Sequence, residues 1–255
     1  MLSEAQIAAY QAPENLLAER VIMITGAGDG IGKTAALSCA QHGATVILAG
    51  RTVAKLEQVY DAIIASGGAE PVIYPIDLEG ARSDDYDQLC SHIDEQFGRL
   101  DGLLHNAGIL GQRTPLNNYR SDVWEKVMQV NVTAGFLMTQ ALMPVFEKSD
   151  SASVVLTSSS VGRTGRSFWG AYAVSKFAVE GMVQVWAEEL EGLGSVRINA
   201  INPGATRTNM RMQAFPAEDP GTLKTAEEIM PSYLYLLGAD SANVNGQSID
   251  AQPHR

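Results

Sequence analysis

A short apolar run, a glycine-rich turn and a helical pattern follow one another near the start of the chain and limit the folds open to it. Residues 21–25, VIMIT, are β-branched and apolar enough for a buried strand, and GAGDGIG comes directly after them. The glycines Gly26, Gly30 and Gly32 allow a ligand to approach the backbone closely, and the pattern at 31–42 points a helix N-terminus at that ligand. We predict a strand, a diphosphate-binding turn and a helix, although a plain connecting turn would use the same residues.

The alternation of strand and helix continues to the end of the chain. Connections of helical length between strands favour parallel pairing with right-handed crossovers. We therefore predict one α/β domain over residues 20–255, with a doubly wound Rossmann fold whose seven-stranded parallel sheet carries helices on both faces, preceded by a polar lead-in at 1–19 with a helical piece at 3–11. The further strands are predicted at 44–51, 71–78, 101–108, 151–159, 196–204 and 246–250, and the further helices at 53–66, 83–97, 122–147, 171–190 and 225–237.

Composition and charge narrow the function classes. A length of 255 residues with 45% apolar content suffices for one large core, and a formal charge of −11 argues against a nucleic-acid partner. We find no basic segment followed by an apolar run at the start and no apolar stretch of about 18 residues, so neither a secretory signal nor a membrane span is predicted. Cys39 and Cys90 are the only cysteines, which favours reduced thiols in a cytoplasmic protein, and no metal site is predicted.

The end of the second predicted strand bears on cofactor choice. A carboxylate there would hydrogen-bond the ribose 2′-hydroxyl of NAD, whereas an arginine would accept the 2′-phosphate of NADP. The strand ends in Gly50 and Arg51, which favours NADP and leaves NAD as the alternative. Asp29 in the glycine turn is a negative charge that would oppose a phosphate, and an ordinary exposed strand end is the other interpretation of Arg51.

Two later strands end in residues suited to the same crevice, which in an open parallel sheet lies at the carboxyl ends of the strands. Asp77, followed by Leu78, is placed to accept a hydrogen bond from the exocyclic amine of an adenine, or else to cap a helix. Asn106, Ala107 and Gly108 are small enough for a cofactor ribose to lie against them. A plain strand-to-loop turn would use the same residues.

A candidate catalytic set follows the fifth predicted strand. Tyr172 and Lys176 are four residues apart and share one helix face, while Ser159 lies 13 residues earlier across a glycine-containing loop. A phenol with a pKa near 10 needs about 4 kcal/mol of help to act as a proton shuttle at neutral pH, and a neighbouring ammonium supplies part of it. The alternative is a chance pair on a solvated helix face.

Two further segments are predicted to serve the site. Asn131 lies inside the predicted helix 122–147 between Val130 and Val132, where an amide needs a partner, structural or catalytic. After Pro203 and Gly204, the stretch 205–222 is long for a loop in a compact domain and is placed to act as a lid.

Taken together, these motifs resemble the classical short-chain dehydrogenase/reductase family over about residues 20–251. Within that family the chain is most similar to the bacterial YciK-like oxidoreductases, through GATVIL, VMQVNV, WGAY and the ending DAQP. His105 stands where the family usually has an asparagine, and we interpret it as a buried strand residue. The motifs that carry the resemblance are TGAGDGIG, HNAG, Asn131, Ser159, Tyr172-xxx-Lys176 and Asn202-Pro203-Gly204-xxx-Thr208.

The resemblance implies a role for each matching residue. Tyr172 would exchange a proton with a carbonyl or alcohol oxygen, Lys176 would lower the pKa of the phenol and bind the nicotinamide ribose, and Ser159 would hold the substrate oxygen. Asn131 would anchor a water that links Lys176 to solvent. The residues expected to bind the cofactor are Gly26, Asp29, Gly30, Ile31, Gly32, Arg51, Asp77, Leu78, Asn106, Ala107, Gly108, Tyr172, Lys176, Pro203, Gly204, Thr206 and Thr208.

The substrate and the assembly are less constrained by the sequence. The function favoured is an NADP-dependent oxidoreductase acting on a small carbonyl or secondary alcohol. A cofactor-binding regulatory or scaffolding subunit, or a dehydratase or epimerase on the same site, stays open. Members of the family pack the helices predicted at 122–147 and 171–190 against partner subunits, which implies a homodimer or homotetramer. Seven apolar residues are candidates to line the substrate pocket, or else to pack in a core or interface: Leu110, Val161, Phe168, Trp169, Met210, Met212 and Phe215.

Overall fold

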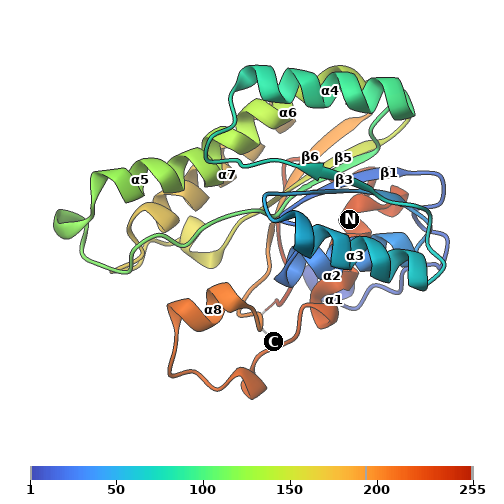
Figure 1. Cartoon of the computed structure of the whole chain (residues 1–255). Helices are drawn as coiled ribbons and strands as arrows, with labels where there is room; N and C mark the ends of the chain where they lie inside the picture. The colour runs from blue at the N-terminus through green and yellow to red at the C-terminus, as the bar shows by residue number, and fades with distance from the viewer. Residues whose placement is uncertain (1, 193, 254–255) are drawn as a thin grey trace.

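The computed structural model of the chain describes residues 2–192 and 194–253, and a parallel sheet of seven strands runs through its centre (Figure 1). The strand order is β3-β2-β1-β4-β5-β6-β7. Because the order reverses between β1 and β4, the carboxyl ends of these strands open a crevice, and the predicted doubly wound fold is confirmed. The strands are β1 (Val21–Thr25), β2 (Thr45–Gly50), β3 (Val72–Pro75), β4 (Gly102–His105), β5 (Ala152–Thr157), β6 (Val196–Asn202) and β7 (Ser248–Asp250).

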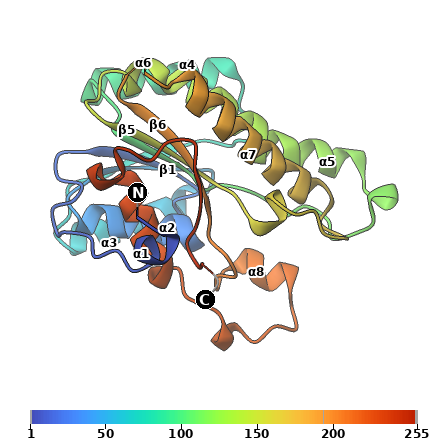
Figure 2. The ribbon, with the colours of Figure 1, turned by 180° about the vertical axis from the view of Figure 1, so that it is seen from behind.

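Helices cover both faces of the sheet, as Figures 1 and 2 show from opposite sides. Side chains alternate along β1, so Ile22 and Ile24 enter one core while Met23 enters the other. No helix among the described residues is both long and apolar enough to span a membrane. One face carries α1 (Glu4–Ala8), α2 (Gly30–Gln41), α3 (Val53–Ala65) and α9 (Met230–Leu237), and the other carries α4 (Ser83–Phe97), α5 (Ser121–Met128), α6 (Ala134–Phe146) and α7 (Gly170–Glu189).

The segment before β1 is part of the packed body and differs from the polar lead-in that the sequence predicts. Ile7 and Leu17 are fully buried in the core beneath α2 and α9. The Tyr10 ring lies 5.3 Å from that of Tyr235, and its hydroxyl donates a hydrogen bond to Asp240. Burial of a few apolar side chains therefore packs this segment against the core, although most of its residues are polar.

The helix predicted at 122–147 is interrupted. Five residues of π-helix, Gln129–Thr133, separate α5 from α6, and Asn131 lies in this segment. Such insertions into helices occur frequently at functional sites. The stretch predicted as a long loop at 205–222 also contains a short helix, α8 (Asn209–Ala214), which stands apart from the sheet in Figure 1.

Candidate active site

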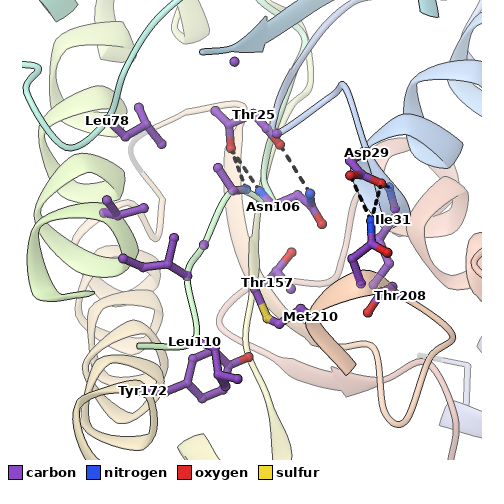
Figure 3. Close-up of a pocket in the computed structure, with 18 of the residues that line it drawn as sticks. Thr25, Asp29, Ile31, Leu78, Asn106, Leu110, Thr157, Tyr172, Thr208 and Met210 are labelled. Atoms are coloured by element: carbon purple, nitrogen blue, oxygen red, sulfur yellow. Dashed lines mark hydrogen bonds between the residues drawn. The ribbon is translucent and has the colours of Figure 1, made fainter. Parts of the chain in front are cut away.

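A cleft of about 740 Å³ lies at the carboxyl ends of the strands. In Figure 3, Leu110 and Tyr172 lie on one side of it, and Asp29 and Thr208 on the other. Gly32 and Asn131 lie outside its lining. The other predicted site residues all line it: Gly26, Asp29, Gly30, Ile31, Arg51, Asp77, Leu78, Asn106, Ala107, Gly108, Ser159, Tyr172, Lys176, Pro203, Gly204, Thr206 and Thr208.

The glycine turn forms one end of the cleft, and two of its glycines are required by geometry. Gly26 has a φ of 68°, and a Cβ there would lie 3.1 Å from the Cα of Ala107. A Cβ at Gly32 would collide with the carbonyl oxygen of Gly26, so Gly32 allows α2 to begin close against the turn. The N-terminus of α2 thus opens into the cleft, as a diphosphate site requires.

Thr25, a residue that sequence reasoning missed, joins the glycine turn to the segment after β4. Its Oγ1 accepts hydrogen bonds from the backbone N–H groups of Asn106 and Ala107, each at 3.1 Å (Figure 3). Two neighbouring strand ends are therefore held in a fixed relation. A threonine at the last position of a buried strand is too common in sheets to have indicated this role.

Ser159, Tyr172 and Lys176 meet at the carboxyl end of β5. Tyr172 and Lys176 lie in the first two turns of α7, and both are at least nine-tenths buried. The ammonium of Lys176 donates a hydrogen bond to the carbonyl oxygen of Thr157 at 2.7 Å and lies 5.5 Å from the centroid of the Tyr172 ring. The phenol and the ammonium therefore lie on one helix face, as the four-residue spacing predicts.

Burial changes the acidity of both groups. It raises the pKa of Tyr172 to about 12, although a hydrogen bond with Ser159 acts in the opposite direction. Burial lowers the pKa of Lys176 to about 8, and the carboxylate of Glu180 opposes that shift. At pH 7 the phenol is therefore neutral and able to donate a proton, while the lysine is predominantly an ammonium.

Asn131 has the partners that its buried position requires. Its Oδ1 accepts a hydrogen bond from the N–H of Ile109 at 2.8 Å, and its Nδ2 donates to the Ile109 carbonyl and to Ser175 Oγ, each at 3.0 Å. Ile109 lines the cleft, so the amide fixes a piece of the cleft wall. The water link to Lys176 stays a prediction.

The segment around α8 borders the cleft on the side of the glycine turn. Thr208 caps α8 by accepting a hydrogen bond from the N–H of Arg211 at 3.1 Å. Asn209 donates to the carboxylate of Asp29, with its nearer oxygen at 3.2 Å, and Arg211 forms a two-bond ion pair with Glu218. The Asn209–Asp29 contact ties the predicted lid to the cofactor end of the cleft, and the other contacts order the segment itself.

The apolar candidates divide into three groups. Leu110, Trp169 and Met210 line the cleft. Phe168 and Met212 are exposed to 53% and 48%, so they do not form a closed pocket wall. The remaining two pack among neighbours, Val161 in a small buried cluster with Tyr172 and Phe215 against the ring of Trp169.

His105 lies in β4, as the sequence predicts, but it is half-buried rather than fully buried. Its Nε2 lies 2.9 Å from Thr139 Oγ1, and burial lowers its pKa to about 3. The imidazole is therefore neutral at pH 7.

The cleft differs in charge from the chain as a whole. Five cations and three carboxylates line it, so its lining is net positive in a chain of formal charge −11. Lys55, Lys126 and Asn209 were not predicted as site residues. Lys55 follows Arg51 by four positions, in the first turn of α3, and this closeness in sequence to a predicted cofactor residue is the signal that could have found it.

The fold and this site define an α/β oxidoreductase class, and the comparisons agree. The chain belongs to the short chain dehydrogenase family, whose sequence model matches residues 20–219. It is 52% identical over 246 residues to the uncharacterized oxidoreductase YciK of Escherichia coli K12, over 96% of this chain and 97% of that protein. The resemblance inferred from the motifs is thereby confirmed.

Solved structures show the same fold. A short chain dehydrogenase from Pseudomonas syringae matches with a TM-score of 0.94 at 53% identity, over 95% of this chain and 98% of that one. Another, from Escherichia coli CFT073 in complex with NADPH, matches with a TM-score of 0.92 at 53% identity, over 94% of this chain and 100% of that one.

Proposed function

We propose that this protein is an NADP(H)-preferring dehydrogenase or reductase that interconverts a carbonyl and a secondary alcohol. The observation that carries the proposal is the meeting of Ser159, Tyr172 and Lys176 in one cleft with the glycine turn and Arg51. The NADPH complex of the similar dehydrogenase from Escherichia coli CFT073 supports the choice of cofactor.

The residues present fit a nicotinamide dinucleotide. Gly26 and Gly32 keep the backbone of the glycine turn close to its neighbouring segments, and the N-terminus of α2 opens towards the site of a diphosphate. Arg51 is exposed at the end of β2 and has no ion pair within residues 2–192 and 194–253, so its guanidinium is available to a 2′-phosphate. When bound, the nicotinamide would supply or accept the hydride.

The protein supplies the proton. Tyr172, neutral at pH 7, donates its hydroxyl proton to the substrate oxygen in the direction of reduction. The Ser159 hydroxyl holds that oxygen, and the Lys176 ammonium stabilises the phenolate that remains. In the direction of oxidation the same groups act in reverse, with Tyr172 as the acceptor.

Replacing Tyr172 by phenylalanine tests this assignment. The variant Tyr172→Phe keeps the ring and loses the proton donor, so reduction of ketones and aldehydes with NADPH should fall by at least about a hundredfold. NADPH binding should persist. Tyr60→Phe is the matched control, because the Tyr60 hydroxyl binds Glu70 on the surface of the molecule. Unchanged turnover in Tyr172→Phe would overturn the mechanism, and products without net redox change would favour a dehydratase or epimerase.

Calorimetric titration with NADPH and then NADH tests the cofactor assignment before a substrate is known. Tighter binding of NADPH supports the role of Arg51, and Arg51→Ala should then lose more affinity for NADPH than for NADH. Tighter binding of NADH would overturn that role. Binding of neither would remove the grounds for an oxidoreductase. Binding of NADPH without turnover of any carbonyl would favour a regulatory or scaffolding subunit.

We further propose a homodimer or homotetramer in the cytoplasm. Four large apolar side chains on α6 and α7 are each more than a third exposed, which favours a partner subunit on that surface. Cys39 and Cys90 are both unpaired in the part of the chain that the structure describes, in keeping with a reducing compartment. The four side chains are Phe136, Val174, Phe177 and Val185.

A further inference from the structure

An ion pair joins two charged residues that line the cofactor end of the cleft. The Nζ atom of Lys55, in the first turn of α3, lies 2.6 Å from Oδ2 of Asp29 in the glycine turn. Both side chains are half exposed, and both line the cleft together with Arg51. Each charge can therefore act on a charged group of a ligand bound there.

Asp29 is a carboxylate placed where a phosphorylated cofactor binds. The Lys55 ammonium lowers the pKa of Asp29, with a further contribution from the N–H of Gly30 at 2.8 Å, so the group is ionised at neutral pH. An unscreened negative charge at this point would repel a 2′-phosphate, which carries about two negative charges at pH 7, more strongly than a hydroxyl. The glycine turn on its own thus disfavours NADP relative to NAD.

The base of the Lys55 side chain lies close against the glycine turn. A Cβ at Gly28 would lie 2.9 Å from the Cβ of Lys55, so the first turn of α3 approaches the backbone of the glycine turn directly. The main chain at Lys55 is therefore close enough to the glycine turn for its ammonium to reach Asp29.

We propose that Lys55 determines cofactor specificity by offsetting the charge of Asp29, which allows the cleft to prefer the 2′-phosphorylated dinucleotide. The inference rests on the proposed function, because it presupposes binding of NADP(H). Arg51 faces the phosphate in this arrangement, and Lys55 acts through Asp29. The negative charge of Asp29 in the cleft is thereby offset by an ammonium 2.6 Å away.

Calorimetric titration of Lys55→Met with both cofactors tests the proposal. Methionine keeps an unbranched stem against Gly28 and removes the charge, so the affinity for NADPH should fall about five- to tenfold while that for NADH changes less than about twofold. Lys33→Met is the matched control, because Lys33 on α2 is not among the residues that line the cleft. Equal losses for both cofactors, or no loss for NADPH, would overturn the proposal.

The double variant separates screening from direct contact. In an Asp29→Asn background the charge to be offset is gone, so adding Lys55→Met should change NADPH affinity by less than about twofold. A loss as large as in the single variant would show that Lys55 contacts the phosphate itself and would overturn the role through Asp29. Failure of the proposed function has a different signature, since the unmodified protein would then bind neither cofactor or bind NADH more tightly. Circular dichroism of each variant checks that the fold is intact.

Discussion

The carboxylate of Glu180 accepts a hydrogen bond from the hydroxyl of Ser158, the residue immediately before Ser159 in the cleft wall. The same oxygen accepts a hydrogen bond from Ser248 Oγ at 2.8 Å, and Arg163 Nε lies 3.4 Å away. Glu180 is one turn of α7 beyond Lys176 and only 8% exposed. One buried carboxylate thus joins the end of β5, α7 and β7 beside the catalytic set, and its charge favours the ammonium form of Lys176.

We predict that Glu180→Gln impairs catalysis without weakening cofactor binding. Glutamine keeps the shape and removes the charge, so the pKa of Lys176 should fall further and the alkaline limb of the kcat profile, on which the ammonium is lost, should move to lower pH. With a ketone that the protein reduces, we expect kcat to fall about three- to tenfold and NADPH affinity to stay within about twofold. Glu188→Gln, an exposed change later on α7, is the control. A fall in kcat with an unmoved pH profile would indicate a structural role only.

His105 should make the protein lose stability in mild acid. Burial lowers its pKa to about 3, whereas in the unfolded chain it titrates near its ordinary value of 6.5. Between these values the unfolded state binds more protons, so the free energy of unfolding falls as pH falls, by at most about 1.4 kcal/mol per pH unit for this group. Urea unfolding of the protein and of His105→Gln from pH 7.5 to 4.5 measures the contribution. Parallel curves for the two proteins would contradict it.

The sheet could be predicted from the sequence because parallel strands buried on both faces are continuous apolar runs. VIMIT at 21–25 is β1 to the residue, and the glycines that follow it could be assigned by their spacing alone. The pairing of Tyr172 and Lys176 could be predicted for a similar reason, since a spacing of four residues in a helix brings two side chains to one face.

Other features depend on contacts between segments far apart in the chain, which spacing does not encode. Asp29 and Lys55 are 26 positions apart, and the sequence between them carries no sign of their ion pair, so Asp29 alone suggests opposition to a phosphate. The π-helical turn around Asn131 has no proline or glycine to mark it, and the Asn131 amide in it donates a hydrogen bond to the carbonyl of Ile109, 22 positions earlier in the chain. Both the ion pair and the contact of Asn131 depend on segments that only the folded chain brings together.

Leu17 should contribute to global stability although it precedes β1. Its side chain is fully buried in the core, so Leu17→Ala should lower the free energy of unfolding by about 2–5 kcal/mol through lost burial and a cavity. Leu2→Ala is the matched control, because Leu2 is 39% exposed and should cost less than about 0.5 kcal/mol. Equilibrium unfolding in urea compares the two. Similar values would mean that residues before β1 add nothing to the core.

The apolar surface on α6 and α7 predicts how the oligomer can be dissociated. Phe177 and Val185 on α7 are 45% and 54% exposed, and Phe136 on α6, whose ring lies 6.4 Å from that of Trp186 on α7, is 38% exposed, so both helices present large apolar groups to solvent. A carboxylate buried there without a partner costs several kcal/mol, so Phe177→Glu should convert the assembly to single chains in sedimentation at micromolar concentration. Ile64→Glu is the control, because Ile64 is 45% exposed on α3, a helix that packs on the opposite face of the sheet from α6 and α7. A Phe177→Glu protein that keeps the mass of the unmodified assembly would place the interface elsewhere, and an unmodified protein that sediments as a single chain would overturn the homo-oligomer itself.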